Sequence, residues 1–267
     1  MITVNGFTIN QEAFGDGTLK CAAIPDSIIN TSMSMQDIRW AYDNDAELFT
    51  LCCLVDHIRE NYPFDDDIVL SMPYIPHARQ DRNVSGRLFT LKTFAKIINS
   101  LNFKKVRVLD PHSDVSTALI DRIDVSFPFA LYDRATECDA IMFPDAGAAK
   151  KYGAIIDFVD RPTIVGNKHR NKEGRIESYE LMNFPDGVKS VAIIDDIVSF
   201  GGTFVAAAKA LREKGVEKVI LIVSHCENNI LKGEVFDNID EVYTTNSICT
   251  IEHPQLHIAD IYRLKGV

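Results

Sequence analysis

Residues 191–203 have the sequence VAIIDDIVSFGGT, and this stretch decides the fold class. Its apolar run is typical of a buried strand over residues 190–195, which ends in the adjacent carboxylates Asp195 and Asp196. A short loop follows, and the Gly-Gly-Thr sequence at 201–203 opens a helical pattern. A strand that leads through a glycine turn into a helix favours an α/β protein with a mainly parallel sheet.

The same alternation of strand and helix patterns extends over both halves of the chain. The predicted strands are 67–73, 106–110, 190–195 and 218–224, and the predicted helices are 89–101 and 204–214. We therefore expect two similar α/β domains, over residues 1–125 and 126–267, with the last segment packing back on the first domain. The polar, glycine-flanked stretch 167–178 is typical of a mobile loop.

The composition excludes several classes of protein. The chain of 267 residues has 28 Lys and Arg against 38 Asp and Glu, a net charge of −10, and 46% hydrophobic residues. This balance excludes a disordered chain and argues against a nucleic-acid partner, which would require a basic surface. No apolar run approaches the roughly 20 residues of a membrane span, so no membrane partner is expected. Six cysteines without a CxxC pair fit the reduced thiols of a cytoplasmic protein.

The stretch that follows the predicted strand 190–195 carries chemistry suited to a phosphorylated sugar. Glycines let backbone N–H groups approach an anion, and a helix N-terminus adds unpaired donors. Asp195 and Asp196 could accept hydrogen bonds from vicinal sugar hydroxyls or hold a metal through water. An Asp cap followed by a glycine turn explains the same residues without a ligand.

Motifs along the chain resemble the ribose-phosphate diphosphokinases, also called phosphoribosyl pyrophosphate synthetases. Residues 73–82, PYIPHARQDR, are similar to that family's PY-x-x-ARQDR stretch, and 191–203 are similar to its ribose-phosphate loop. Shorter matches in the family's order are LDPH at 109–112, FPDAG at 143–147, KHR at 168–170 and TNSI at 245–248. Together they span most of the chain, which we interpret as a short, divergent member.

This resemblance implies two tandem type I phosphoribosyltransferase-like domains with an active site in the cleft between them. The implied reaction is the Mg²⁺-dependent transfer of the β,γ-diphosphate of ATP to the anomeric hydroxyl of a phosphorylated ribose. Ribose 5-phosphate would give phosphoribosyl pyrophosphate and AMP, for nucleotide biosynthesis. The family also implies a homo-oligomer, at least a dimer, in which the ARQDR segment helps to build the ATP site near a subunit interface.

The resemblance also assigns roles to individual residues. Lys168 and Arg170 would be catalytic, and His112 and Asp145 would hold Mg²⁺, although His is a less usual ligand for this metal. The implied ATP-binding residues are Arg79, Gln80 and Asp26, and the implied ribose-phosphate-binding residues are Asp195, Asp196, Ser199, Phe200, Gly201, Gly202 and Thr203. Plainer interpretations are a surface salt-bridge network of Arg79, Asp81 and Arg82, a structural His112, and a solvated loop around Lys168 and Arg170.

The sequence departs from the family at points that bear on the substrate. Ser199 and Phe200 stand where the family has Asp and Thr, and residues 26–28 retain only the first Asp of its DGE motif. Residues 113–120 differ as well, and the chain is shorter than typical members. Two alternatives stay open: the same chemistry on ADP-ribose, giving ADP-ribose pyrophosphate for NAD salvage, and a non-catalytic regulatory homologue of a synthetase.

Overall fold

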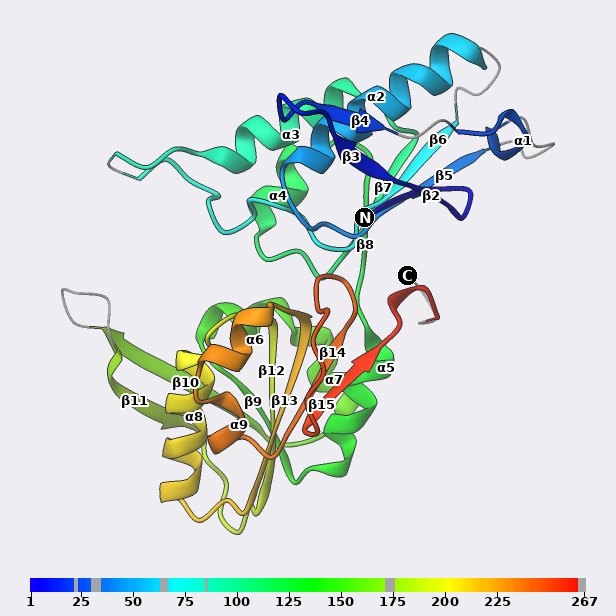
Figure 1. Cartoon of the computed structure of the whole chain (residues 1–267). Coiled ribbons are helices and arrows are strands. Elements are labelled where there is room, and N and C mark those ends of the chain that lie inside the picture. The colour runs from blue at the N-terminus through cyan, green and yellow to red at the C-terminus, as the bar shows by residue number, and fades with distance from the viewer. Residues whose placement is uncertain (22–23, 30–34, 63–66, 85, 171–175, 264–267) are drawn as a thin grey trace. The chain divides into compact units, whose positions relative to one another are not determined.

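The computed structural model describes residues 1–267 except 22–23, 30–34, 63–66, 85, 171–175 and 264–267 (Figure 1). The chain divides into two compact units, Met1–Ser126 and Phe127–Val267. Each unit is an α/β layer structure, so the fold class expected from the sequence is confirmed. No helix among the described residues has both the length and the apolar character that crossing a bilayer requires.

Unit 1 has a six-stranded sheet in the order β2-β1-β5-β6-β7-β8. The last four of these strands are parallel, and β1 and β2 extend the sheet as an antiparallel hairpin. The strands are β1 (Ile2–Val4), β2 (Phe7–Ile9), β5 (Gln36–Trp40), β6 (Ile68–Ser71), β7 (Lys105–Leu109) and β8 (Ile123–Ser126), with a separate pair of β3 (Gln11–Ala13) and β4 (Leu19–Cys21). The helices are α1 (Asp26–Ile29), α2 (Ala46–Asn61), α3 (Thr90–Ser100) and α4 (Asp114–Leu119).

The core of unit 1 follows from the apolar spacing in its sequence. Helix α3 buries Leu91, Phe94 and Ile98, which recur at helical spacing and pack in the same core as the sheet. Trp40 at the end of β5 is fully buried, and its indole N–H donates to Glu47 Oε2 at 2.8 Å. Trp40 is therefore a core residue whose one polar atom is satisfied.

Unit 2 has a seven-stranded sheet in the order β11-β10-β9-β12-β13-β14-β15, parallel except for β11. Its strands are β9 (Ala140–Phe143), β10 (Thr163–Arg170), β11 (Ile176–Met182), β12 (Ser190–Val198), β13 (Lys218–Cys226), β14 (Glu241–Thr245) and β15 (Leu256–Ala259). Its helices are α5 (Phe129–Tyr132), η1 (Asp133–Glu137), α6 (Ala146–Lys151), α7 (Gly153–Val159), α8 (Gly202–Glu213), η2 (Asn228–Lys232), α9 (Val235–Asn238) and η3 (Ile261–Arg263).

Strand β12 is covered on both faces, which explains its continuous apolar run. Val191 and Ile193 join the core that contains the buried face of α8, whereas Ala192 and Ile194 join the core that contains α5 and α7. This alternation is the period of two that a strand imposes on its side chains. Helices on both faces are the usual setting of a parallel sheet.

Two local expectations were wrong. Strand β12 continues to Val198 instead of ending at the carboxylate pair, because it keeps pairing with β13 as far as Cys226. The expected loop over 167–178 contains strand ends instead: β10 runs to Arg170 and pairs antiparallel with β11. Residues 171–175 lie outside the described residues. The strands of this hairpin are polar near the turn, so apolar runs do not indicate them.

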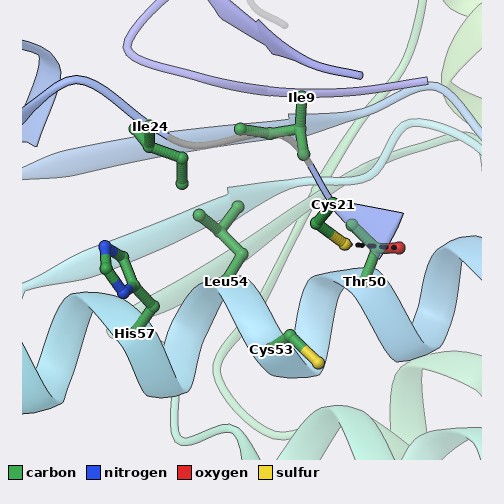
Figure 2. Close-up of a pocket in the computed structure, with 7 residues that line it drawn as sticks. All are labelled: Ile9, Cys21, Ile24, Thr50, Cys53, Leu54 and His57. Atoms are coloured by element: carbon green, nitrogen blue, oxygen red, sulfur yellow. Dashed lines mark hydrogen bonds between the residues drawn. The ribbon is translucent and has the colours of Figure 1, made fainter. Parts of the chain in front are cut away.

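A pocket of about 250 Å³ lies in unit 1, where the side of α2 meets β2 and β4 (Figure 2). Its lining is mostly apolar, with Thr50 and the Cys21 thiol in contact at 3.7 Å. Burial raises the pKa of the Cys53 thiol at the same pocket, so this thiol is protonated at neutral pH. The pocket contains none of the site residues expected from the sequence.

Candidate functional site

The carboxylates Asp195 and Asp196 lie near the carboxyl end of β12, beyond the end of the neighbouring strand. Strand β9 stops at Phe143, and its last pairing with β12 is Met142 opposite Ile193. Past this point one edge of β12 is no longer paired with β9, while the other edge stays on β13. Ligands of α/β proteins bind at this carboxyl edge of the sheet.

The two carboxylates of this pair have different surroundings. Asp196 is 5% exposed, and its Oδ2 lies 2.9 Å from Lys151 Nζ. Asp195 accepts a hydrogen bond of 2.9 Å from the backbone N–H of Asp196. Burial is the main cause that raises the pKa of Asp195 to about 8, and the charge of the adjacent Asp196 carboxylate is the second. Asp196 therefore has a lysine counter-ion, and Asp195 carries a proton over much of the neutral range.

Asp145 and Lys168 form a second charged pair in this unit. Asp145 caps the N-terminus of α6 by accepting from the Ala148 N–H at 3.0 Å, and its Oδ2 lies 2.8 Å from Lys168 Nζ. Burial alone would raise the pKa of Asp145, but the hydrogen bonds from Lys168 and from backbone N–H groups outweigh it and lower that pKa. Asp145 is therefore an anion at neutral pH.

Tyr179 ties the β10–β11 hairpin to the loop that carries Asp145. Tyr179 lies opposite Lys168 in the strand register, and its hydroxyl donates to the Pro144 carbonyl at 2.9 Å. A Cβ atom on Gly166 would lie 2.1 Å from the Tyr179 hydroxyl, so only glycine allows this approach. Burial and the nearby Asp145 and Asp195 carboxylates raise the pKa of Tyr179, which keeps its hydroxyl protonated as a donor.

Arg170 is the last residue of β10, and its backbone pairs with Ile176. This places Arg170 two residues beyond Lys168 on the same strand, at the end of the described part of the hairpin. The pairing of β10 with β11 shifts in register between His169 and Arg170, so the strand is irregular between the two residues of the K-x-R motif.

The glycine turn after β12 is closely packed on one side and open on the other. Gly201 caps α8 with a φ of +78°, and a Cβ there would lie 2.0 Å from Val235 Cγ2. A Cβ on the next residue, Gly202, would meet no atom of the described residues within 4 Å. Gly202 and Thr203 begin α8, whose first N–H groups lack helical partners. The turn therefore leaves open space at a helix N-terminus, where an anion is favoured.

Ser199 and Phe200, the two departures from the family pattern, precede this turn. The Ser199 hydroxyl donates to Glu227 Oε2 from the segment that follows β13. The Phe200 side chain is not part of the core, since the residue is 55% exposed. A carboxylate thus lies beside the turn even though the family's Asp is replaced by Ser199.

In unit 1, the ARQDR segment and the LDPH segment lie together after the carboxyl ends of β6 and β7. Ser113 directly follows His112, and Asp81 directly follows Gln80. Ser113 donates to Asp81 Oδ2 at 2.7 Å, and this hydrogen bond joins the two motifs. Gln80 Oε1 accepts from Thr90 at the start of α3 at 2.9 Å. Arg79, Gln80 and His112 are exposed. The two motifs therefore form one polar surface on this unit.

Part of the expected salt-bridge network is present at this surface. Arg82 Nε lies 2.9 Å from Asp81 Oδ1, and this hydrogen bond is the main cause that lowers the pKa of Asp81. The same carboxylate also accepts from Ser113, so it holds the two motifs together. Asp81 and Arg82 thus have a structural explanation.

Asp26 does not join Arg79 and Gln80 within unit 1. It begins α1, is exposed, and accepts from the Tyr62 hydroxyl at 2.8 Å at the C-terminal end of α2. The same short helix is held to Gln36, the first residue of β5, through the Ile29 carbonyl. Asp26 therefore lies at the amino end of the sheet, whereas Arg79 and Gln80 follow the carboxyl end of β6 (Figure 1).

The described residues contain no cluster of three or more His, Cys, Asp or Glu side chains that could hold a metal on their own. His112 belongs to unit 1 and Asp145 to unit 2. Asp145 offers one ionised carboxylate, which suits Mg²⁺ when substrate phosphates and water supply the remaining ligands. The residues thus fit a metal that arrives with its nucleotide better than a permanent protein site.

Sequence reasoning missed three residues of this site: Lys151, Tyr179 and Glu227. Lys151 and Tyr179 act through contacts with Asp196 and Pro144 that no local pattern reveals. Glu227 had a usable signal. Because β12 and β13 are neighbouring parallel strands of similar length, the residues that follow Val198 and Cys226 are expected to lie side by side.

Comparisons with known proteins agree with the motifs. The chain is 26% identical to a ribose-phosphate pyrophosphokinase of Helicobacter hepaticus, over 97% of this chain and 85% of the relative. It is 27% identical to the enzyme of that name from Campylobacter jejuni, over 88% of this chain and 77% of the relative. The crystal structure of phosphoribosylpyrophosphate synthetase from Mycobacterium smegmatis matches 95% of this chain with a TM-score of 0.77 at 19% identity, over 86% of that chain. No protein-family model matches the chain.

The resemblance inferred from the motifs is therefore confirmed: the chain is similar in sequence to ribose-phosphate pyrophosphokinases over most of its length. The structural match is at low identity and supports the fold, which fits the expected pair of phosphoribosyltransferase-like domains.

Proposed function

We propose that this protein transfers the β,γ-diphosphate of ATP to the anomeric hydroxyl of a phosphorylated ribose, with ribose 5-phosphate as the first candidate acceptor. The observation that carries the proposal is the grouping in unit 2 of the Lys168–Asp145 pair, the Asp195–Asp196 pair and an open glycine turn at the N-terminus of α8. The sequence similarity to ribose-phosphate pyrophosphokinases supports the same enzyme class.

The proposed reaction forms one bond and breaks another at the β-phosphorus of ATP. The anomeric oxygen attacks this phosphorus, the bond to the oxygen that bridges the α- and β-phosphates breaks, and that oxygen leaves with AMP. The hydroxyl proton is released to solvent. Such transfers require positioning and charge stabilisation more than covalent help from the protein.

Each group of residues has a role in this proposal. Lys168 and Arg170 stabilise negative charge on the transferred group and on the leaving AMP. Asp195 and Asp196 accept hydrogen bonds from the ribose hydroxyls. The turn from Ser199 to Thr203, with Gly201 and Gly202, receives the 5-phosphate at the α8 N-terminus. Arg79 and Gln80 contact ATP.

Mg²⁺ would supply charge neutralisation on the ATP phosphates when it is bound with the nucleotide. Asp145 is the residue of unit 2 best suited to contact it, because its pKa is lowered and its carboxylate is ionised. Lys168 pairs with that carboxylate, so the lysine would be released toward the diphosphate as the cation arrives. His112 is a second candidate ligand, from unit 1.

A homo-oligomer is part of the proposal. Asp26 lies at the opposite end of the unit 1 sheet from Arg79 and Gln80. If all three contact one ATP, Asp26 must come from another copy of the chain. Size-exclusion chromatography with light scattering tests this, and a species of one chain's mass at assay concentration would exclude a shared ATP site.

The decisive experiment measures AMP release from Mg–ATP with and without ribose 5-phosphate. We expect AMP only when an acceptor is present, and a fall in rate of about 100-fold or more in Lys168→Ala, the scale seen when a preorganised charge is removed. The matched control is Lys189→Ala, which removes an exposed lysine paired with Glu217 at 2.8 Å. AMP release that is independent of the acceptor, or unchanged in Lys168→Ala, would contradict the proposal.

ADP-ribose is a second candidate acceptor, favoured by the exposed Phe200 and by the Glu227 carboxylate that accepts from Ser199. In ADP-ribose the phosphate on the ribose carries a second substituent and one negative charge, whereas the terminal phosphate of ribose 5-phosphate carries nearly two. The adenosine part of ADP-ribose also extends beyond the turn, where an exposed aromatic ring offers a stacking surface. Mass spectrometry of the products from each acceptor, supplied separately, distinguishes the two candidates.

A further inference from the structure

The turn that we assign to the acceptor phosphate has a carboxylate beside it. Glu227 Oε2 accepts the hydrogen bond of the Ser199 hydroxyl. Ser199 is two residues before Gly201, the cap of α8. The negative charge thus lies next to the helix N-terminus that would attract an anion.

Backbone hydrogen bonds hold the main chain of Glu227 beside the turn. The N–H of Glu227 donates to the Val198 carbonyl at 2.9 Å, and the Glu227 carbonyl accepts from Ile230 at 3.1 Å. Farther along the same segment, Gly233 packs so closely on the turn that a Cβ there would lie 2.0 Å from the Phe200 carbonyl oxygen. The segment 227–233 therefore packs against the turn, and the main chain of Glu227 is fixed beside it.

The hydrogen-bond direction removes one donor from the turn. A serine hydroxyl has a single proton, and at Ser199 that proton is donated to Glu227. An incoming phosphate oxygen consequently meets a serine whose proton is already donated to Glu227, together with the Glu227 carboxylate itself. Both features oppose a group with two negative charges more than a group with one.

From this geometry we infer that Glu227 is a specificity-determining residue. It weakens binding of a terminal phosphate dianion and favours an acceptor whose phosphate carries a second substituent, as in ADP-ribose. The inference rests on the proposed function, because it concerns the acceptor side of the same site. It identifies the residue that sets the preference between the two candidate acceptors.

The test compares Glu227→Gln with wild type for two acceptors, ribose 5-phosphate and ADP-ribose. Gln keeps the shape and can accept the Ser199 hydrogen bond, so the fold is retained while the charge is lost. We expect kcat/KM for ribose 5-phosphate to rise about 5- to 10-fold, the size of one unit charge acting on a dianion at moderate distance. For ADP-ribose we expect a smaller rise of about 2- to 3-fold, because its phosphate carries half the charge and therefore half the interaction energy.

The matched control is Glu234→Gln on the same segment. Glu234 is exposed and pairs with Lys209 at 3.3 Å, so this variant removes an equal charge from the surface without touching Ser199. It should leave the ratio of the two acceptors unchanged. Raising the salt concentration should reduce the gain in Glu227→Gln and have no effect on the control ratio.

Calorimetric titration of ribose 5-phosphate into each variant provides a readout that does not require turnover. Tighter binding to Glu227→Gln than to wild type supports the inference even if no AMP forms, an outcome that would overturn the proposed function alone. Equal binding, no binding by either protein, or parallel changes for both acceptors together with a lower melting temperature would overturn the inference and leave Glu227 a structural residue.

Discussion

Lys168 Nζ lies 2.8 Å from Asp145 Oδ2, so the cation proposed for the diphosphate is paired with the carboxylate proposed for the metal. A comparable pair links Lys151 Nζ to Asp196 Oδ2 at 2.9 Å. Each lysine offsets the burial cost of its partner in the free protein. Binding of a nucleotide with its cation would replace these partners and release the lysines toward phosphate. In the free protein these two carboxylates are thus each paired with a lysine before any ligand arrives.

Asp145→Asn tests this exchange. Asn retains the N-cap of α6, so we expect the free energy of unfolding to change by less than about 1 kcal/mol. Activity should nevertheless fall about 100-fold, and the Mg²⁺ concentration needed for half-maximal rate should rise, because the ionised ligand is lost. The control is Asp157→Asn, an exposed change on α7. An unchanged Mg²⁺ dependence in Asp145→Asn would remove Asp145 from the metal assignment.

The raised pKa of Asp195 predicts that the stability of the fold depends on pH. Its folded pKa is raised to about 8 from the ordinary aspartate value of 3.8, so between these values the folded chain binds more protons than the unfolded chain. Stability from this group therefore falls as pH rises from about 4 to about 8. Asp195→Asn, which mimics the neutral form, should be more stable than wild type by several kcal/mol at pH 9, and this difference should shrink to about 2 kcal/mol or less at pH 5.

Chemical unfolding at pH 5, 7 and 9 measures this difference. Asp139→Asn is a suitable contrast, because hydrogen bonds from Lys189 and Ser190 lower the pKa of Asp139. That carboxylate stabilises the fold above its unfolded pKa, and its loss should cost stability at neutral pH instead of adding to it. A stability difference for Asp195→Asn that is the same at pH 5 and pH 9 would show that Asp195 is ionised throughout.

The parallel core of the fold could be predicted from the sequence, because covered strands leave continuous apolar runs. Strands β6, β12 and β13 contain such runs, β7 alternates charged and apolar residues, and α3 and α8 show helical spacing. The β10–β11 hairpin could not, since its strands are held by backbone pairing between polar residues such as Lys168 and Tyr179. Apolar periodicity carries no information about strands of that kind.

The candidate site likewise has residues that the sequence indicates and contacts that it does not. Residues at or after the ends of apolar runs, such as Asp195 and the glycine turn, could be predicted because the carboxyl edge of a sheet collects ligand-binding groups. The contact of Glu227 with Ser199 depends on the register of two strands, and the separation of Asp26 from Gln80 depends on the direction of α2. Both are consequences of three-dimensional pairing that a linear motif does not encode.

Gly201→Ala is expected to destabilise unit 2. The residue has a φ of +78°, and the new Cβ would lie 2.0 Å from Val235 Cγ2. Gly187→Ala is the matched control, since Gly187 has the same φ of +78° but no atom of the described residues within 4 Å of the Cβ position. Backbone strain alone should cost about 1 kcal/mol in Gly187→Ala, and the added clash about 2 kcal/mol more in Gly201→Ala. Equal losses in urea unfolding would show that the turn moves to accept the methyl group.

Gly202→Ala should separate binding from stability. A Cβ at this position meets no described atom within 4 Å, and Ala is a better helix former than Gly at the start of α8. We therefore expect a melting temperature equal to or above that of wild type. If the acceptor phosphate occupies the open space at this helix end, the methyl group will raise the KM for the acceptor about 10-fold or more, since it blocks close approach to the backbone. Gly153→Ala at the start of α7, which is equally open, is the control and should leave KM unchanged. An unaltered acceptor KM in Gly202→Ala would place the phosphate elsewhere.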